Sequence, residues 1–300
     1  MHRLGAYAGA PVRNAGLGFN MLDLLLHIDT YAEPTSSPAI EFAVRFASAI
    51  GCPLAGLATH VDIHVPDNWL AERLLNVSKL AGIEEAKSYD FATAALKRLA
   101  SAADAAGVQH ESIIARAPLH GIGPCVTRYA RTRDICLLQI GDQMDSERSV
   151  AEEVIFGSGR AVLVFHPERA PLPTGPLKRV AIAWDHSRCS ARAVAEAMPL
   201  LRKAQDVRIV TAVGEKAAAT PGLGSDLVRH LRLHGISASI DEIDGRQRTI
   251  GASLDAYCDE HSPDLLVMGA YGSSRLKEFI LGGATEHTLN RARVATFLCH

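Results

Sequence analysis

The sequence repeats one pattern twice, and this duplication constrains the fold more than any other feature. In each half, short apolar runs of the β type alternate with stretches of helical periodicity. The runs are 22–29, 53–60, 110–115, 135–141 and 161–165 in the first half, and 179–185, 207–213, 237–243, 264–269 and 294–299 in the second. This alternation is typical of a parallel sheet covered by crossover helices. We therefore predict an α/β fold of two tandem doubly wound domains, each a five-stranded parallel sheet with helices on both faces.

Two landmarks recur in both halves. An Asp lies at the end of the first run (Asp29, Asp185), and a Gly ends the fourth (Gly141, Gly269). The two landmarks lie 112 residues apart in the first half and 84 in the second, so the first copy is enlarged by 28 residues. We place this insert in 62–92. The pattern indicates an internal duplication with one enlarged copy.

The helix after the first run of each half shows apolar residues at i, i+3, i+4 and i+7, which predicts a buried face. These residues are Ile40, Ala43, Val44 and Ala47 in the first half, and Ala191, Val194, Ala195 and Met198 in the second.

The domain boundaries follow from changes in composition. Residues 1–20 are rich in Gly and Ala and lack the apolar core of a signal peptide, so we expect a flexible N-terminal arm. The first domain is predicted at 21–166 and the second at 178–300. Between them, residues 167–177 are rich in proline, which indicates a stiff linker.

Composition excludes several classes of function. The net charge is −2 and the pI is about 6.7, with no basic stripe to follow nucleic acid or an anionic membrane. No apolar run approaches the roughly 20 residues that span a bilayer. The six cysteines form no CxxC pair, which favours reduced, buried thiols in a cytoplasmic protein and no metal site.

The segment MGAYGSSRLKEFILGGATEH (268–287) carries the strongest chemical signal. Ligands of open parallel sheets bind at the carboxyl ends of the strands, where the strand order reverses. Asp185 and Gly269 would flank that crevice in the second half. Glycines allow a close approach of backbone N–H groups, and a helix starting near Gly283 would add its dipole for a phosphate. Asp185 would accept from an adenine amino group or a ribose hydroxyl.

The spacing Gly269-x2-Gly272-x9-Gly282 resembles the G-2x-G-9x-G-(S/T) signature of the universal stress proteins. The duplication resembles the tandem type of that family over 22–300. The resemblance implies a Rossmann-like sheet ordered 3-2-1-4-5, halves paired through their last strands, a role in the stress response, and ATP or AMP binding, with Mg²⁺ only if ATP binds. The nucleotide-binding residues it implies are Ala183, Trp184, Asp185, Ala212, Met268, Gly269, Gly272, Ser273, Gly282, Gly283, Ala284 and Thr285.

The second half departs from the signature at two positions. Gly283 replaces the Ser or Thr after the third glycine, so a hydroxyl that would face the phosphates is absent, and only Thr285 or Ser273 offers a substitute. Trp184 precedes Asp185, where its ring would narrow the base pocket or stack in it.

The first half departs further. After Gly141 no glycine follows until the Gly157–Gly159 turn, which we interpret as the end of a helix. Asp142, Asp145 and Glu147 would repel phosphate. We therefore predict that the first domain has lost the ligand motif.

Other signals are weaker. The glycines admit a purely structural interpretation as a tight strand-to-helix connection, and Asp185 alone would more often cap a helix. His60, His64 and Asp67 would share a metal only on a helix, and they follow a strand. His186 lacks an accompanying nucleophile.

Two further segments of the sequence carry weak signals. The HGIG segment (120–123) lies before the fourth strand, which is the wrong place for nucleotidyltransferase chemistry. NWLAERLLNV (68–77), within the insert, reads as a lid on its own domain, with a pocket cover or a partner face as alternatives.

We therefore expect a stress-response protein that acts by ligand-dependent interaction, with at most slow ATP hydrolysis and no catalytic residues. The alternatives are a protein-interaction module that binds no nucleotide, and a hydrolase or transferase using the same crevice. The two copies form an internal pseudo-dimer, and a homodimer of such chains is equally compatible with the sequence. Neither the stress nor the protein partner follows from the sequence.

Overall fold

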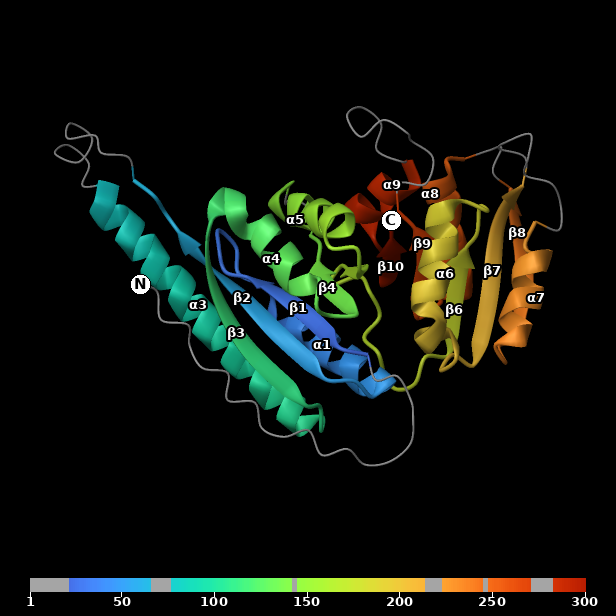
Figure 1. Cartoon of the computed structure of the whole chain (residues 1–300), viewed down its shortest axis with the longest axis horizontal. Helices are drawn as coiled ribbons and strands as arrows, with labels where there is room; N and C mark the ends of the chain where they lie inside the picture. Colours follow the sequence, from blue (N-terminus) through green and yellow to red (C-terminus); the bar gives the residue numbers. More distant parts are fainter. Residues whose placement is uncertain (1–21, 66–76, 142–144, 214–222, 245–247, 271–282) are drawn as a thin grey trace.

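The computed structural model describes residues 22–65, 77–141, 145–213, 223–244, 248–270 and 283–300. The two halves lie side by side along the longest axis of the molecule (Figure 1). All strands belong to one ten-stranded sheet with the order β3-β2-β1-β4-β5-β10-β9-β6-β7-β8. Each half therefore has the predicted order 3-2-1-4-5, and the predicted α/β fold is confirmed.

The strands occupy the predicted apolar runs. They are β1 (Leu24–Asp29), β2 (Leu54–Asp62), β3 (His110–Pro118), β4 (Ile135–Gln139), β5 (Ala161–Phe165), β6 (Arg179–Ala183), β7 (Asp206–Val213), β8 (Ala238–Asp244), β9 (Leu265–Gly269) and β10 (Thr296–Cys299). Within each half the described pairings are parallel.

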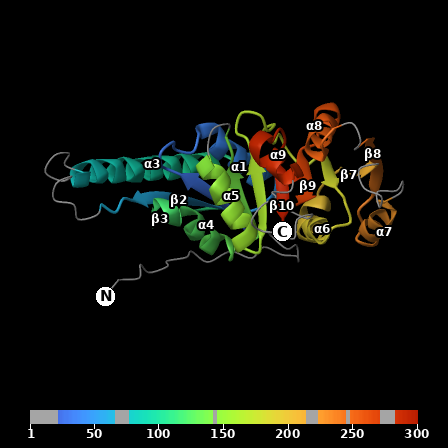
Figure 2. The same cartoon turned by 90° about the horizontal axis from the view of Figure 1, so that it is seen from above.

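Helices cover both faces of the sheet (Figure 2). One face packs against α1 (Ser37–Ile50), α3 (Val77–Ala105), α6 (Arg188–Leu201) and α7 (Ser225–Leu233). The other packs against α4 (Ile122–Ala130), α5 (Asp145–Gly157), α8 (Ile250–His261) and α9 (Gly283–Arg291). A short 3-10 helix, η1 (Leu119–Gly121), precedes α4.

The two halves join through their last strands. Strand β10 pairs with β5 in the antiparallel direction, with Phe297 opposite Leu163. This pairing continues the sheet from one half into the other, and buries both residues completely. The expectation that the halves meet through their last strands is confirmed.

The helix after the first strand was predicted well in one half and less well in the other. In α1 the predicted face from Ile40 to Ala47 is buried, and Ser36 caps the helix by accepting from the Ala39 N–H at 3.3 Å. In α6, Val194 and Met198 are buried, but Ala191 and Ala195 are exposed. Alanine carries little apolar area, so it does not fix which face of a helix packs on the sheet.

The enlargement of the first half is visible in α3. This helix has 29 residues, whereas its counterpart α7 has 9. It begins at Val77, so it includes part of the predicted insert. The segment 66–76, which holds most of the predicted lid, lies outside the described residues.

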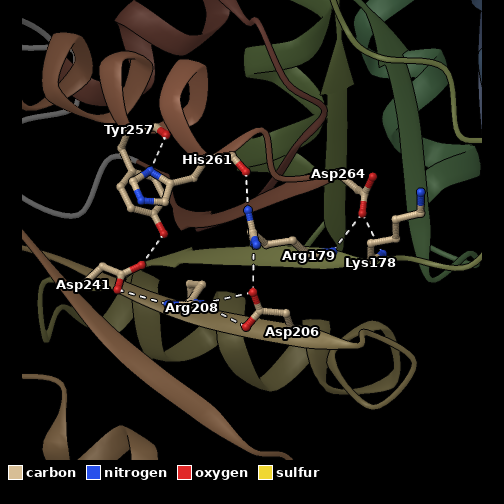
Figure 3. A network of polar contacts seen from close by, with 8 residues as sticks. All are labelled: Lys178, Arg179, Asp206, Arg208, Asp241, Tyr257, His261 and Asp264. Atoms are coloured by element: carbon tan, nitrogen blue, oxygen red, sulfur yellow. Dashed lines mark hydrogen bonds and ion pairs between the residues drawn. The ribbon is translucent and has the colours of Figure 1, made fainter.

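Polar contacts tie together the strands of the second half near their amino ends (Figure 3). The Asp264 carboxylate accepts from the backbone N–H groups of Lys178 at 2.6 Å and Arg179 at 2.8 Å. The Arg179 side chain donates to Asp206 at 2.8 Å and to the His261 carbonyl at 2.5 Å. The start of β6 is thus fixed to β7, β9 and the end of α8.

The same network continues toward the edge of the sheet. Arg208 donates to Asp206 at 2.9 Å and to Asp241 on β8 at 3.4 Å. The buried Tyr257 on α8 donates its hydroxyl to Asp241 at 2.6 Å, and its ring stacks on His261 with centroids 4.2 Å apart. These contacts hold α8 on the sheet (Figure 3).

Candidate functional site

The carboxyl ends of β6 and β9 form the reversal point of the second half. These strands are neighbours, and Ala183 lies opposite Met268 in their register. Trp184 and Asp185 follow directly after β6, and Gly269 ends β9. The structure therefore brings Asp185 and Gly269, which are far apart in the sequence, to one edge of the sheet, where α/β proteins bind ligands.

Several predicted residues face the same side of this edge. Ala183, Met268 and Ala284 belong to the apolar cluster beneath α8 and α9. Ala212 lies two residues after Val210 of that cluster, so strand alternation places it on the same face. Ala183, Ala212 and Ala284 are all half-buried. These small side chains leave an apolar surface that reaches the edge of the sheet.

Gly269 has a structural reason to be glycine. A Cβ atom there would lie 2.5 Å from the Ser190 backbone nitrogen, 2.6 Å from the Cys189 carbonyl carbon and 2.9 Å from the Cys189 Cβ. The first turn of α6 therefore packs against β9 at a distance that only glycine allows. At this position the close approach is between two parts of the protein, as the structural interpretation expects.

The turn from β6 to α6 is sharply shaped. His186 has φ of 60°, a left-handed conformation that is uncommon outside glycine. Its Nε2 lies 2.9 Å from the Leu223 carbonyl oxygen. Ser187, and not Asp185, is the N-cap of α6, since its hydroxyl accepts from the Ser190 N–H at 3.0 Å. The exposed Asp185 instead accepts from the Ser187 N–H at 2.9 Å, which orients its carboxylate at the edge.

Trp184 lies on the opposite face of the sheet from Ala183, toward α6. Its backbone N–H donates to Val210 at 2.9 Å, which sets it beside Thr211 on β7. The buried Trp184 Nε1 and Thr211 Oγ1 atoms have no hydrogen-bond partner within the described parts of the chain. Trp184 thus packs against the core of this face, and its ring lies 5.1 Å from that of His186. Thr211 was missed by sequence reasoning.

The first turn of α9 closes the described part of the site. The helix begins at Gly283, as predicted. Thr285 is only 2% exposed, so its hydroxyl is not presented at the surface as a substitute for the missing Ser or Thr. One turn further, Thr288 donates to the Met268 sulfur at 3.6 Å, which ties α9 to β9. Gly272, Ser273 and Gly282 lie outside the described residues.

The equivalent edge of the first half is filled by a carboxylate. Glu147 on α5 accepts from the Gly141 backbone N–H at 2.5 Å and from the Gln139 side-chain amide at 2.7 Å. Burial raises the pKa of Glu147 above its ordinary range. The structure ends β4 at Gln139, so Gly141 follows the strand by two residues and does not end it as predicted. An anionic side chain of the protein therefore already accepts from the N–H group of Gly141 just beyond β4.

Two further ionisable groups lie beside Glu147. Burial raises the pKa of Asp29 to about 6, although its carboxylate accepts from the N–H groups of Thr30 and Tyr31. Burial also lowers the pKa of His27 to about 4. One small cavity is lined by His27, Asp29 and Glu147. This edge of the first half therefore contains three buried ionisable side chains.

Among the residues that the structure describes, the weaker signals of the sequence form no site. The His60 ring packs edge-on against Tyr89, and Asp67 lies outside the described residues. In the described ranges, no group of three or more His, Cys, Asp or Glu residues is arranged to hold a metal. HGIG spans η1 and the start of α4, away from the end of β1. All six cysteines are free and buried.

None of the described helices is both long enough and apolar enough to cross a bilayer.

Comparison with known proteins gives a family match in the second half. Residues 176–300 match the model of the universal stress protein family. No curated protein sequence matches the chain significantly.

Solved structures extend the likeness to both halves. A universal stress protein from Archaeoglobus fulgidus DSM 4304 is 18% identical with a TM-score of 0.67, over 93% of this chain and 96% of that one. A putative universal stress protein from Pseudomonas aeruginosa UCBPP-PA14 is 13% identical with a TM-score of 0.53, over 93% of each chain. At these identities the likeness establishes the fold that the two halves build together.

Proposed function

We propose that this protein, whose residues 176–300 form a universal stress protein domain, binds an adenine nucleotide at the edge formed by β6 and β9. It would act in the stress response through ligand-dependent interaction, without rapid turnover. Mg²⁺ would accompany the ligand only if the ligand is ATP. The first domain would contribute no nucleotide site of its own.

One observation carries this proposal. Ala183 lies opposite Met268 in the register of β6 and β9, and both Ala183 and Ala284 of α9 pack, half-buried, against the apolar cluster on this face of the sheet, which leaves a small apolar surface there. Such a surface suits the flat, weakly polar face of a purine. Asp185 is exposed at its border with an oriented carboxylate, suited to accept from an amino or hydroxyl group.

The phosphate end would lie toward α9. The helix starts at Gly283 in the second half, and its first-turn N–H groups and dipole favour an anion. The buried Thr285 supplies no surface hydroxyl there, which favours a ligand with few phosphates, such as AMP, over ATP.

The first half supports a single site per chain. Glu147 takes the Gly141 N–H at the edge that corresponds to β6 and β9. A phosphate would have to displace this carboxylate and then lie beside Asp29 as well.

A second candidate function is a protein-interaction module that binds no nucleotide. Gly269 favours this alternative, because its contact with the first turn of α6 already explains a glycine without any ligand. Under this interpretation, the spaced glycines serve only the packing of the second half and bind no ligand.

Calorimetric titration with AMP and ATP separates the two candidates. We expect a Kd on the order of micromolar, corresponding to about −8 kcal/mol, with one site per chain. Asp185→Ala should weaken binding at least about tenfold, since a hydrogen bond to a charged group contributes roughly 1.5–3 kcal/mol. Asp90→Ala, an exposed carboxylate on α3, is the matched control and should bind as the unmodified protein does. Binding unaffected by Asp185→Ala would contradict the proposed site.

A further inference from the structure

Two exposed histidines lie one helical turn apart at the end of α7. His230 belongs to this helix and His234 is its C-terminal cap residue, so the two share one face of the helix. Their ring centroids lie 4.8 Å apart, with an angle of 65° between the ring planes. Strand β8 starts shortly afterwards, at Ala238, which places the pair near the amino ends of the parallel strands. The proposed nucleotide edge, at the carboxyl ends, uses neither histidine.

The geometry of this pair suits a transition metal. Two histidines at i and i+4 on one face of a helix are an arrangement in which both rings bind one Zn²⁺. Zn–N distances of about 2.0–2.1 Å and a tetrahedral angle place the centroids of two such rings about 5 Å apart, close to the 4.8 Å between His230 and His234. Both rings are exposed, so they can turn toward a common ion without disturbing the core.

One cation contacts the pair. The Arg202 Nη2 lies 3.5 Å from the His234 Nδ1. A guanidinium only donates, so in this contact Nδ1 presents a lone pair, which is the group that a metal binds. Arg202 is exposed, so a metal can take its place. The two arginines of α7, Arg229 and Arg232, lie about 100° or more around the helix from both histidines. Arg202 is therefore the cation that a metal would displace.

The pair supplies only half of a zinc site. A structural zinc ion almost always has four protein ligands in a tetrahedral arrangement. Among the residues that the structure describes, no further His, Cys, Asp or Glu joins His230 and His234 in a metal-binding group. A second copy of the chain, related by a two-fold axis, would present the same two histidines. The two pairs together would supply the four ligands.

The position of α7 leaves this face open to a second copy. Two views of the molecule place α7 at the end farthest from α3 (Figure 1 and Figure 2). Leu233, next to His234 and three residues after His230, is 78% exposed, the highest value among the exposed large apolar side chains of the described ranges. Pairing of α7 with its copy would remove this side chain from water, which is favourable.

We propose that His230 and His234 bind Zn²⁺ together with the same two residues of a second copy, so that one ion joins two chains through their α7 helices. This site is separate from the nucleotide edge and does not rest on the proposed function. It gives a homodimer of this chain a defined interface, and it makes that interface depend on a metal.

Sedimentation velocity on the full chain, prepared without a polyhistidine tag, tests the proposal with ZnCl₂ as the probe. We expect the mass measured in EDTA to double when Zn²⁺ is added at one ion per two chains, and to return when EDTA is restored. His230→Ala and His234→Ala should each abolish the doubling. Both positions are exposed, so the variants should remain folded, which circular dichroism would verify. Arg202→Ala should double at a lower Zn²⁺ concentration, because it removes a positive charge beside the ion.

His120→Ala is the matched control, since it removes an exposed histidine on η1, outside the pair, and should leave the doubling unchanged. An unchanged mass of the unmodified protein on addition of Zn²⁺ would overturn the proposal. Doubling that persists in His230→Ala and His234→Ala would place the metal elsewhere and would overturn it too. Zinc retained after desalting at one ion per chain, without a change in mass, would contradict a site shared by two copies.

Discussion

Replacing Gly269 with alanine tests the packing of β9 against α6. The new Cβ would lie 2.5 Å from the Ser190 backbone nitrogen, whereas ordinary contact begins at 3.4 Å. The first turn of α6 would have to retreat by the difference, about 0.9 Å, because its backbone cannot rotate away like a side chain. Ser187 holds that turn by its cap, so the retreat also strains the cap.

The expected cost is about 2–3 kcal/mol in the free energy of unfolding, the upper part of the usual range for overpacking. Gly82→Ala is the matched control, since Gly82 lies inside α3 with nothing within 4 Å of an added Cβ. That variant should be more stable by about 0.5–1 kcal/mol, because alanine favours a helix over glycine. Urea unfolding followed by circular dichroism measures both. If Gly269→Ala were as stable as the unmodified protein, the close approach of β9 to the first turn of α6 would be refuted.

Two predictions concern other polar groups. Tyr257→Phe should lower the free energy of unfolding by about 1–2 kcal/mol in urea unfolding, since it removes the donor to Asp241 at 2.6 Å; an unchanged midpoint would contradict the network of Figure 3. Asp29→Asn should stabilise the protein at pH 7 by up to about 3 kcal/mol, because the raised pKa of about 6 means that the ionised form is disfavoured in the folded state. Because the pKa of Asp29 is raised from 3.8 to about 6 on folding, Asp29 raises the free energy of unfolding of the native protein as the pH falls from about 6 to 3.8. Because the pKa of buried His27 is lowered from 6.5 to about 4, His27 lowers the free energy of unfolding as the pH falls from 6.5 to about 4. The variant keeps only the second effect, so unfolding measured from pH 6.5 to 4 should show a steeper loss of stability, and equal slopes would contradict this account.

The fold was largely predictable from the sequence. Alternating apolar runs and helical stretches determine a parallel sheet with helices on both faces, and the duplication predicts two copies of it. The pairing of β5 with β10 followed from the family resemblance and is confirmed. The buried face of α6 was less predictable, because Ala191 and Ala195 signal burial too weakly.

The site was predictable only in part. The approach of Asp185 to Gly269 followed from topology, because the reversal point brings the first and fourth strands together. The role of Gly269 could not be predicted, because a glycine before a loop can make room either for a ligand or for a neighbouring backbone segment. Only the tertiary structure reveals its contact with the Ser190 backbone. The left-handed His186 has no signature in the sequence.

The ion pair between Arg148 of α5 and Glu286 of α9, 3.5 Å apart, could not be predicted from the sequence either. It joins residues of different halves, and nothing in the pattern of either helix indicates which side chains face each other across the junction.

Nucleotide binding by the intact protein and by Gly272→Val tests the central claim most directly. Gly272 is the second glycine of the spaced signature and has no counterpart at the edge of the first half. Calorimetry with AMP should show a Kd on the order of micromolar for the intact protein, and loss of binding in Gly272→Val. Equal affinity in both proteins, or no binding in either, would contradict a nucleotide site in the second domain.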